Sequence, residues 1–593
     1  MPKFDPLPYR IRIGIVGRRS LLEVKELSRC LSEFLGDFPT GPFWQLFKAS
    51  QREPLAKLHA EARTPIFLEL LSPRAEGADR LAAEVVLARK SQHLWPEGSL
   101  RAVLPLAEAE YLTSFEVPGS TEEFRKLLAA SRRPVRLDTC LDTCRSQAGV
   151  RTFGNAGDLR NRAYDGAGRY VVDHCDLLIA LWDGQHKPLR ADGSKEHDGT
   201  LDAVNYARIE GVPVYRIWTD GEELLNPDAL ESLDLSAAQG IDLYNHRPVL
   251  ASAADAELAC LEQDLFAKYP ESAVIPDAAR HLARQMLFPH YCRTSVVADE
   301  CQRQYYDVGK WGYTLAAVAV ACAAVGVLFE PVAPVAFLAE ILALACICWM
   351  KERARKNHAH GTWIEHRFLA ERLRAAQFMA LCGVEPRPME VPEYMEHSQS
   401  ENDWTIHAFD EIWSRLPDFT QAETRNSHPA PGQFKDAANY ICKVWIGEQE
   451  SYHKRKSQTE GMWRKRLSWI GEVVLPLSIL AATLHLLLFG LHWWIEIPKL
   501  SEGIARFLIS FIALVAPAVS ASIAGFTAHR EHQRLEKRSA NMVRQLAVLG
   551  RRMDAVETDD EFRSMLQDLD EEVMLRELQD WLMLMKYVEI KAG

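Results

Sequence analysis

Four long apolar runs in the C-terminal half constrain the fold of this chain more than any other feature. The first two cover about residues 311–329 and 334–350, and the other two cover about residues 470–491 and 504–526. Each is close to the length that an α-helix needs to cross a hydrocarbon layer of about 30 Å. Because a short connection joins the two runs of each pair, we expect an all-α membrane domain with four transmembrane helices in two hairpins.

Basic residues flank both pairs, whereas the connections inside each pair carry few of them. The flanking basic residues are Lys310, Lys351, Arg353, Arg355, Lys356, Lys454, Arg455, Lys456, Arg464, Lys465, Arg466, Arg530, Arg534, Lys537 and Arg538. Such residues stay on the cytoplasmic side of a membrane. The N-terminus lacks the pattern of a signal peptide. We therefore expect a multi-pass membrane protein with both termini in the cytoplasm.

Composition excludes some partners. The chain has 593 residues, enough for several separately packed units, and its 69 Lys and Arg are outnumbered by 81 Asp and Glu. No basic face stands out away from the apolar runs, so we expect no nucleic-acid partner. Cys140 and Cys144 have no second pair at zinc-site spacing. We expect no metal site and take these two cysteines as free thiols.

Before residue 220, short apolar runs alternate with helical stretches, as a parallel α/β sheet requires. The expected strands cover residues 12–16, 66–71, 101–104, 175–182 and 212–218. This pattern predicts a doubly wound, Rossmann-like α/β domain in the cytoplasm.

Glycines and charged residues follow three of these strands and open a later helix. They are Gly17, Arg18, Arg19, Glu76, Gly77, Asp79, Asp183, Gly184, Gly199 and Thr200. Ser20 to Glu23 reads as a capping box for the first helix, and arginines at a helix N-terminus suit a phosphate group. Because ligands of open α/β sheets bind at the carboxyl ends of the strands, we expect one shared pocket. Each glycine alone has the alternative of an ordinary turn.

These segments resemble the SLOG superfamily over about residues 10–220. The resemblance rests on Gly-x-x-Gly-Arg-Arg, Ala-Glu-Gly-Ala-Asp-Arg, Val-Leu-Pro-Leu, Cys-Asp-Leu-Leu-Ile-Ala-Leu-Trp-Asp-Gly and Asp-Gly-Thr. It implies a nucleotide-derived signalling ligand and no other cofactor. By this resemblance, Gly17, Arg18 and Arg19 approach phosphate, Glu76, Gly77 and Asp79 hold ribose or fix the loop, and Asp183, Gly184, Gly199 and Thr200 close the pocket. Tyr164 would supply a stacking face.

The base-releasing enzymes of that superfamily carry Pro-Gly-Gly-x-Gly-Thr-x-x-Glu, which this chain lacks. It has Glu-His-Asp-Gly-Thr-Leu-Asp-Ala at 196–203, so Asp202 is the carboxylate nearest to the position of the glutamate. A shorter side chain changes the geometry that a general base needs. A membrane-tethered nucleotide hydrolase, with Asp202 or Glu76 as its working carboxylate, remains the alternative function.

An internal repeat organises the membrane half. Tyr305-Tyr306 precedes the first pair of apolar runs and Tyr452-His453 the second, and each pair is followed by a charged helical stretch, at 363–382 and 531–553. This layout resembles SLATT modules, two-span units found beside nucleotide sensors in bacterial conflict systems. The resemblance implies pore formation in the bacterial inner membrane during antiviral defence.

Glu340 and His485 are the ionisable residues inside the apolar runs that we single out as pore candidates. The alternatives are contact with headgroup water or pairing with a neighbouring helix. Four spans per chain are few for a conducting path, so a pore would require a homo-oligomer. A third possibility is that the spans serve only as an anchor in the lipid bilayer.

The expected domains are 1–220 for the sensor, 221–300 for a helical connector, 301–383 for the first two-span unit, 384–435 for a loop-rich linker, 436–555 for the second two-span unit, and 556–593 for an acidic C-terminal helix.

Overall fold

The computed structural model describes residues 4–570 except 37–40, 61–63, 90–93, 138–155, 186–197, 234, 357, 387–402, 420–428, 430–431 and 493–503. The chain divides into two compact units, and each contains several separate segments. Unit 1 comprises Met1–Pro248, Pro276–His290 and Met379–His428, and unit 2 comprises Val249–Ile275, Tyr291–Phe378 and Pro429–Gly593. Cys140, Cys144 and most of the expected acidic C-terminal helix lie outside the described residues.

Unit 1 contains a seven-stranded sheet with the order β4-β3-β2-β1-β5-β6-β7. Its strands are β1 (Tyr9–Gly17), β2 (Ile66–Ser72), β3 (Leu100–Leu104), β4 (Arg132–Arg136), β5 (Leu177–Leu181), β6 (Val214–Trp218) and β7 (Gly221–Leu224). All neighbours are parallel except β6 and β7. The five expected strands are confirmed. Strands β4 and β7 were not expected, because Arg-Arg-Pro-Val-Arg and Gly-Glu-Glu-Leu contain no apolar run.

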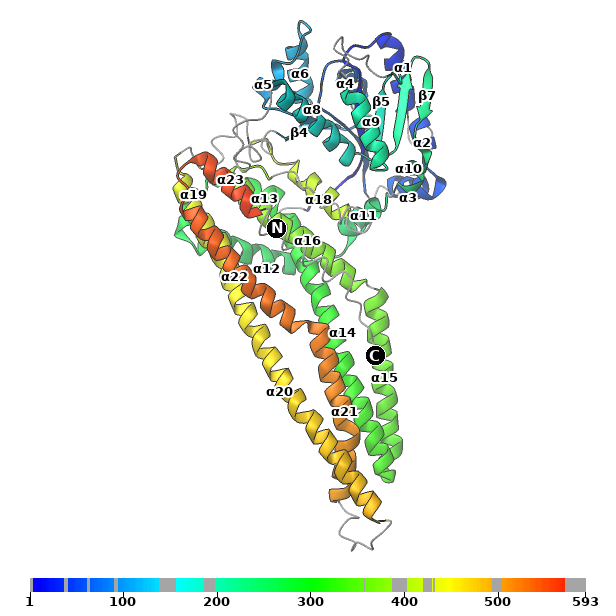
Figure 1. The fold of residues 1–593 in the computed structure, drawn as a ribbon, viewed down its shortest axis with the longest axis vertical. Helices are drawn as coiled ribbons and strands as arrows, with labels where there is room; N and C mark the ends of the chain where they lie inside the picture. The colour runs from blue at the N-terminus through cyan, green and yellow to red at the C-terminus, as the bar shows by residue number, and fades with distance from the viewer. Residues whose placement is uncertain are drawn as a thin grey trace. The chain divides into compact units, whose positions relative to one another are not determined.

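The strand order reverses at β1. Strands β2, β3 and β4 extend the sheet on one side of β1, and β5 and β6 extend it on the other. Helices α8 (Ala156–Asp173) and α9 (Gly199–Ile209) contribute to an apolar core with β1, β2 and β5 (Figure 1). Helices α1 (Val24–Phe34) and α4 (Ala78–Ala88) pack against each other and contact β6 and β1 respectively. A reversal of this kind leaves a crevice at the carboxyl ends of β1 and β5.

The first helix begins later than the sequence suggested. Helix α1 starts at Val24, and its N-cap is Glu23, which has a left-handed backbone with φ of 56° and makes no capping hydrogen bond through its side chain. The expected capping box from Ser20 to Glu23 is therefore wrong. The residues after Gly17 instead continue as a loop, which leaves Arg18 and Arg19 outside the helix.

The remaining helices of unit 1 include one that the sequence analysis placed in a loop-rich linker. They are α2 (Pro42–Gln45), α3 (Ala49–Ala60), α5 (Glu108–Leu112), α6 (Ser120–Ala129), α10 (Pro227–Ser232), α11 (Ala237–His246), α13 (Asp277–Met286) and α18 (Asp403–Trp413). Helix α18 packs against α11. A Cβ atom at Gly240 of α11 would lie 2.4 Å from Trp404 Cγ, so only a glycine at this position allows the two helices to come so close.

Helix α18 covers a charged part of the sheet. In the strand register, Arg12 of β1 lies beside Glu69 of β2, and Arg101 of β3 lies beside Arg132 of β4. Side chains of paired residues in neighbouring strands point to the same face of a sheet. Arg10 belongs to this face as well because it is two residues from Arg12. Four arginines and a fully buried glutamate thus occupy positions that are usually apolar.

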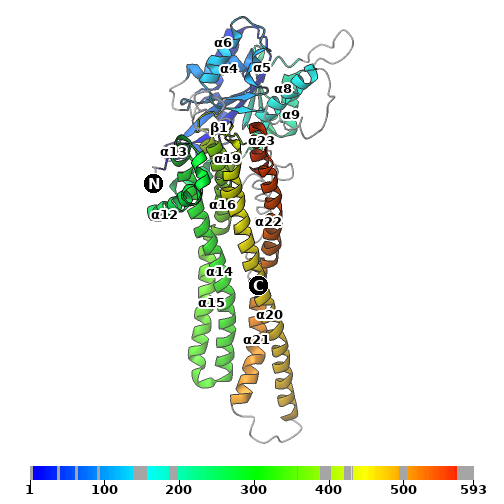
Figure 2. The same ribbon diagram turned by 90° about the vertical axis from the view of Figure 1, so that its left-hand side faces the viewer.

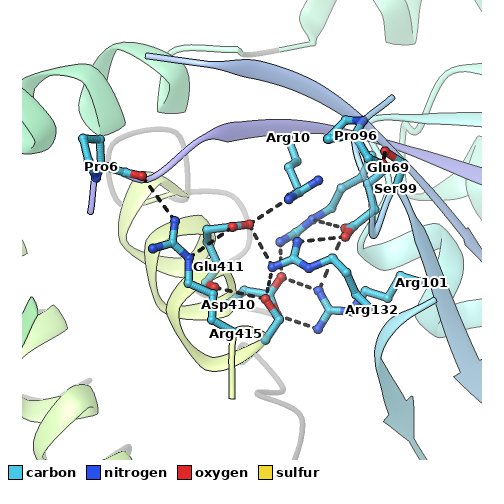
Figure 3. Close-up of polar contacts among 12 residues, drawn as sticks. Pro6, Arg10, Glu69, Pro96, Ser99, Arg101, Arg132, Asp410, Glu411 and Arg415 are labelled. Carbon is cyan, nitrogen blue, oxygen red and sulfur yellow. Dashed lines mark hydrogen bonds and ion pairs between the residues drawn. The ribbon is translucent and has the colours of Figure 1, made fainter. Parts of the chain in front are cut away.

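Two carboxylates of α18 neutralise these arginines (Figure 3). Asp410 Oδ2 accepts a hydrogen bond from Arg12 at 2.5 Å, and Asp410 Oδ1 accepts one from Arg101 at 2.6 Å. Glu411 Oε2 pairs with both Arg10 and Arg132 at 2.9 Å. Arg132 also reaches Glu69 at 3.0 Å.

The network holds Asp410 and Glu69 in the charged form. Burial alone would raise the pKa of Asp410, but Arg101 and Arg12 outweigh it and hold that pKa well below its usual range. Burial would also raise the pKa of Glu69, but the arginines around it, Arg132 foremost, outweigh burial and lower that pKa. The favourable pairing of Asp410 is therefore present at neutral pH and is lost only as the pH falls through its depressed folded-state pKa.

Unit 2 is helical. Its elements are α12 (Ala251–Glu262), η1 (Gln263–Ala267), η2 (Pro270–Val274), most of α14 (Phe288–Leu328), η3 (Glu330–Val332), α15 (Ala333–Lys356), most of α16 (Ala359–Cys382), α19 (Phe434–Tyr440), η6 (Ile441–Ile446), α20 (Gly447–His492), α21 (Ile504–Arg530), α22 (His532–Asp554) and α23 (Asp559–Leu569). Helix α20 packs along α21 and α22. Helices α14 and α15 lie side by side (Figure 2). Phe337 of α15 approaches Gly326 of α14.

Four helices of the described chain are long and apolar enough to cross a membrane, as expected. The four segments are Phe288–Leu328, Glu330–Lys356, Phe434–Leu487 and Phe507–Asp554. Large apolar side chains on them are exposed, among them Val335, Leu338, Ile341, Ile479 and Leu486. Soluble proteins rarely expose apolar surface on this scale, whereas a lipid-facing helix does so as a rule.

We expect Asp410→Asn to loosen α18 because Arg12 and Arg101 lose their buried counter-charge. Breaking a buried ion pair costs about 3–5 kcal/mol. Hydrogen exchange of the full chain should show faster exchange across residues 403–413. The control is Glu231→Gln, which removes an exposed ion pair with Lys48. It should change the free energy of local opening, as measured by hydrogen exchange, by no more than about 1 kcal/mol. Unchanged protection of α18 in the Asp410 variant would contradict a supporting role of the network.

Candidate functional site

Four segments meet at the carboxyl end of the sheet. The backbone N–H of Arg18 donates to Leu181 O at 3.2 Å, which joins the ends of β1 and β5. Ala78 N–H donates to Arg18 O at 3.1 Å and so brings in the start of α4. Thr200 Oγ1 donates to Gly17 O at 2.9 Å and adds the start of α9. The loops that the sequence analysis assigned to one pocket are therefore brought together.

Two glycines are required by this close approach. A Cβ atom at Gly17 would lie 2.4 Å from Ala78 Cβ and 2.6 Å from Leu181 O. Gly77 has a φ of 87°, and a Cβ atom there would lie 2.3 Å from Arg19 O. Packing of the loops alone explains both glycines.

Arg18 connects two loops through its guanidinium group. Its Nη1 lies 3.0 Å from Asp198 Oδ2, and its Nη2 lies 3.1 Å from Asp183 Oδ1 and also donates to Gln185 O. The side chain is only 15% exposed. Two carboxylates thus already surround the arginine that we expected to approach phosphate.

Arg19 is exposed and has a different partner. Its guanidinium lies 5.5 Å from the ring centre of Tyr164 in α8, a cation–π contact. The hydroxyl oxygen of Tyr164 is buried and has no hydrogen-bond partner among the described residues. The expected stacking residue is therefore beside the expected phosphate-binding loop.

The loop after β2 is fixed by buried charges. Asp79 Oδ2 accepts from Ala75 N–H at 3.0 Å, and burial raises the pKa of Asp79 to about 6, against the opposing effect of Arg74 and Arg19. Arg74 is fully buried, bonds to Ser72 Oγ at 3.1 Å, and has its pKa lowered to about 10 by burial. Asp79 was expected either to hold ribose or to fix the loop. This geometry accounts for the second role.

Glu76 is turned toward a neighbouring segment. It accepts hydrogen bonds from Ser120 Oγ at 2.5 Å and from the backbone N–H groups of Val117 and Glu116. Burial would raise the pKa of Glu76, but these donors outweigh it and lower the pKa. Its carboxylate is therefore committed to holding the start of α6.

The start of α9 contains a residue that the sequence analysis missed. Asp198 is the N-cap of α9, accepts from Leu201 N–H at 3.4 Å, and also pairs with Arg18. An aspartate directly before Gly199-Thr200 is a common N-cap signal, so the sequence contained the clue. Asp183 accepts from Gln185 N–H at 3.1 Å, and Gly184 has a φ of 77°.

Asp202 is placed differently from Thr200. Its side chain is exposed, whereas Thr200 is buried against Gly17. Successive residues of an α-helix are about 100° apart, so Asp202 projects about 200° around α9 from Thr200. Asp202 therefore does not face the loop after β1.

The two pore candidates both have partly buried side chains. In α15 the less exposed positions Ala333, Ala336, Glu340, Ala343 and Ile347 follow one another at steps of three and four residues. Such positions form one stripe along a helix, so Glu340 lies on the packed side of α15. His485 Nδ1 is 2.9 Å from Ser510 Oγ of α21, which is the helix-pairing alternative.

No group of three or more potential metal ligands occurs among the residues that the structure describes. Cys140 and Cys144 fall outside them. No protein-family model, curated protein or solved structure matches the chain.

We expect Gly77→Ala to destabilise the site more than Gly119→Ala does. Both glycines have a positive φ, of 87° and 84°, but a Cβ atom at Gly119 has no other atom within 4 Å. Gly119 has a left-handed backbone with ψ of −10°, which costs an alanine about 1–2 kcal/mol. Gly77 has ψ of −119°, outside that region, so an alanine there is more strained, and only Gly77→Ala adds the clash with Arg19 O. Limited proteolysis of the full chain should cut the loops near Gly77 faster in that variant alone. Equal cleavage in both variants would show that the loops have room to separate.

Proposed function

We propose that the chain is a membrane effector gated by a nucleotide-derived messenger. The observation that supports this proposal most is the meeting of three strand-end loops and the start of α9 where the strand order reverses, in a chain that also has four span-length apolar helices. In this proposal the α/β domain is doubly wound and Rossmann-like, faces the cytoplasm and binds the messenger. The apolar helices form two hairpins that open or disrupt the bacterial inner membrane in antiviral defence.

Arg18 provides a physical route from ligand binding to movement. Its present partners, Asp183 and Asp198, belong to the segments on either side of residues 186–197. A phosphate group would compete with these carboxylates for the same guanidinium donors. The released carboxylates would repel the phosphate, so the two segments would move away from Arg18. Messenger binding and rearrangement of these segments are then one event.

The enzyme alternative has less support from the geometry. Glu76 is occupied by three hydrogen-bond donors, and Asp202 projects away from Gly17. A general base must come within hydrogen-bond reach of the proton that it removes. Neither candidate carboxylate is placed to do so at the end of β1.

Gating requires the messenger to bind the open arrangement more tightly than the closed one. A shift from 1:99 to 99:1 takes about 5.5 kcal/mol of differential binding. A homo-oligomer can sum this difference over its subunits, and a ring of chains would also provide enough helices to surround a path through the bilayer.

We expect messenger-dependent dye release from liposomes that contain the full-length protein, and its loss in Arg19→Ala. This residue is exposed and contacts Tyr164, so its removal should leave the fold intact. The matched control is Arg208→Ala, an exposed arginine in the last turn of α9, which should release dye as the parent does. The test uses a panel of cyclic, linear and ribosylated adenine and guanine nucleotides.

If none of these compounds releases dye although one binds, the gated-effector proposal fails. Turnover of the bound compound would then support the hydrolase, and its absence would support a simple anchor.

If Glu340 lines the path, Glu340→Gln should reduce the preference of the open state for cations over anions, because rings of carboxylates favour cations. Glu330→Gln is the control, since Glu330 is exposed in the connection before α15. Reversal potentials in planar bilayers measure the preference. The same reversal potential in the parent and in Glu340→Gln would place Glu340 away from the path.

A further inference from the structure

Two residues other than glycine have a left-handed backbone at equivalent places in the two repeats of the membrane half. His358 has a φ of 45° and lies between α15 and α16, and Glu531 has a φ of 49° and lies between α21 and α22. Each follows the second apolar run of its pair and precedes a charged helix. The chain changes direction at both junctions (Figure 1). A left-handed residue between two helices is therefore part of the repeat.

Glu531 ends one helix and begins the next through its backbone alone. Its N–H donates to Thr527 O at 3.2 Å at the end of α21, and its carbonyl oxygen accepts from Leu535 N–H at 3.1 Å in α22. The side chain of Glu531 makes no capping hydrogen bond and instead pairs with Arg534 at 2.8 Å. The bend thus lacks the side-chain cap that commonly fixes the start of a helix.

The local sequence favours a continuous helix at this bend. No glycine or proline occurs from Thr527 to Leu549, and glutamate is a good helix former. A left-handed residue at a helix end is usually glycine, because other residues are strained in that conformation. Compared with a glycine, Glu531 makes the bent form less favourable and a straight form more favourable. The two forms are therefore closer in free energy than at an ordinary helix end.

Two neighbouring helices hold the residues on either side of Glu531. The guanidinium group of Arg530, the last residue of α21, lies 4.0 Å from the ring centre of Tyr306 in α14. His532, the first residue of α22, is buried, and its Nδ1 lies 2.5 Å from Glu460 Oε2 of α20. A strained backbone persists only where surrounding contacts enforce it. These two contacts supply that constraint on opposite sides of one residue.

A groove beside the junction gives it space to move. The groove has a volume of about 800 Å³, and its lining residues lie within 464–475 of α20 and within 520–534 at the end of α21 and the start of α22. Helix α20 continues past this level without a break, from Gly447 to His492. Packed helices usually leave few voids between them. The groove therefore leaves room for the junction to move against α20.

We propose that Glu531 is the hinge of a two-position switch between α21 and α22. In the bent position, which this structure has, Glu531 is left-handed, and Arg530 and His532 keep their contacts. In the straight position Glu531 has a right-handed helical backbone, and α21 and α22 form one helix. His358 is the equivalent hinge of the first repeat. The switch needs no ligand, so it does not rest on the function proposed for the chain.

Distances between spin labels on α21 and α22 test the proposal in the full-length protein in lipid nanodiscs. The labels are carried by unnatural amino acids at Leu514 and Val548, which are both exposed. A straight helix would place these positions about 50 Å apart, since an α-helix rises about 1.5 Å per residue. The bent form places them closer together. Double electron–electron resonance measures the population of each distance.

Tyr306→Leu should increase the population of the longer distance, because it releases Arg530 and keeps an apolar side chain in α14. Adding Glu531→Gly should reverse this increase by about tenfold, because glycine adopts the left-handed conformation without strain. The matched control is Gln533→Gly in the same Tyr306→Leu protein. Gln533 is exposed and helical, and it would be helical in the straight position as well, so the control should leave both populations unchanged.

The proposal is overturned if the parent and Tyr306→Leu both show the shorter distance alone, because the junction then has one position. It is also overturned if Gln533→Gly removes the longer distance as effectively as Glu531→Gly does. The effect would then come from a weaker helix and not from the left-handed residue. A longer distance in Tyr306→Leu that only Glu531→Gly removes supports the hinge.

Discussion

The α/β domain depends on the pairing of α18 with the arginines of its sheet. Arg10, Arg12, Arg101 and Arg132 share their face of the sheet with one carboxylate, Glu69, so an apolar helix would leave an excess of three positive charges buried beneath it. Asp410 and Glu411 supply two further negative charges. Buried ion pairs contribute little net stability compared with apolar packing, but removing one partner is costly. The network therefore determines which helix covers this face of the sheet and where that helix lies. An apolar contact would specify both less strictly.

The site at the other end of the same strands follows a related logic. Arg18 is neutralised by Asp183 and Asp198, so the loops are closed by charges that a phosphate could replace. The glycines at the loop crossings let the backbones touch, and Asp79 fixes the loop after β2. In the proposed function, the domain combines a fixed charged network under α18 with a network at the strand ends that a ligand exchanges.

The sequence predicted most of what rests on length and periodicity. Five strands and four apolar helices produce clear apolar runs, and the segments named for the site do lie together at the strand ends. It failed at β4, where charge replaces apolar character, and at α18, whose partners are distant in the chain. The roles of Glu76 and Arg18 were also beyond it, because a motif does not show which neighbouring donor or acceptor a side chain will meet.

In the sequence, α18 lies between α16 and α19, far from the strands whose charged face it covers. A fragment that ends at residue 248 would contain every strand of the sheet but would leave its arginines facing water. The α/β domain cannot be separated from the helical part by one cut, nor transplanted onto another protein through one junction. We therefore expect the domain to be inherited together with the apolar helices that flank α18 in the sequence. Recombination at a single junction after the last strand would separate the sheet from α18.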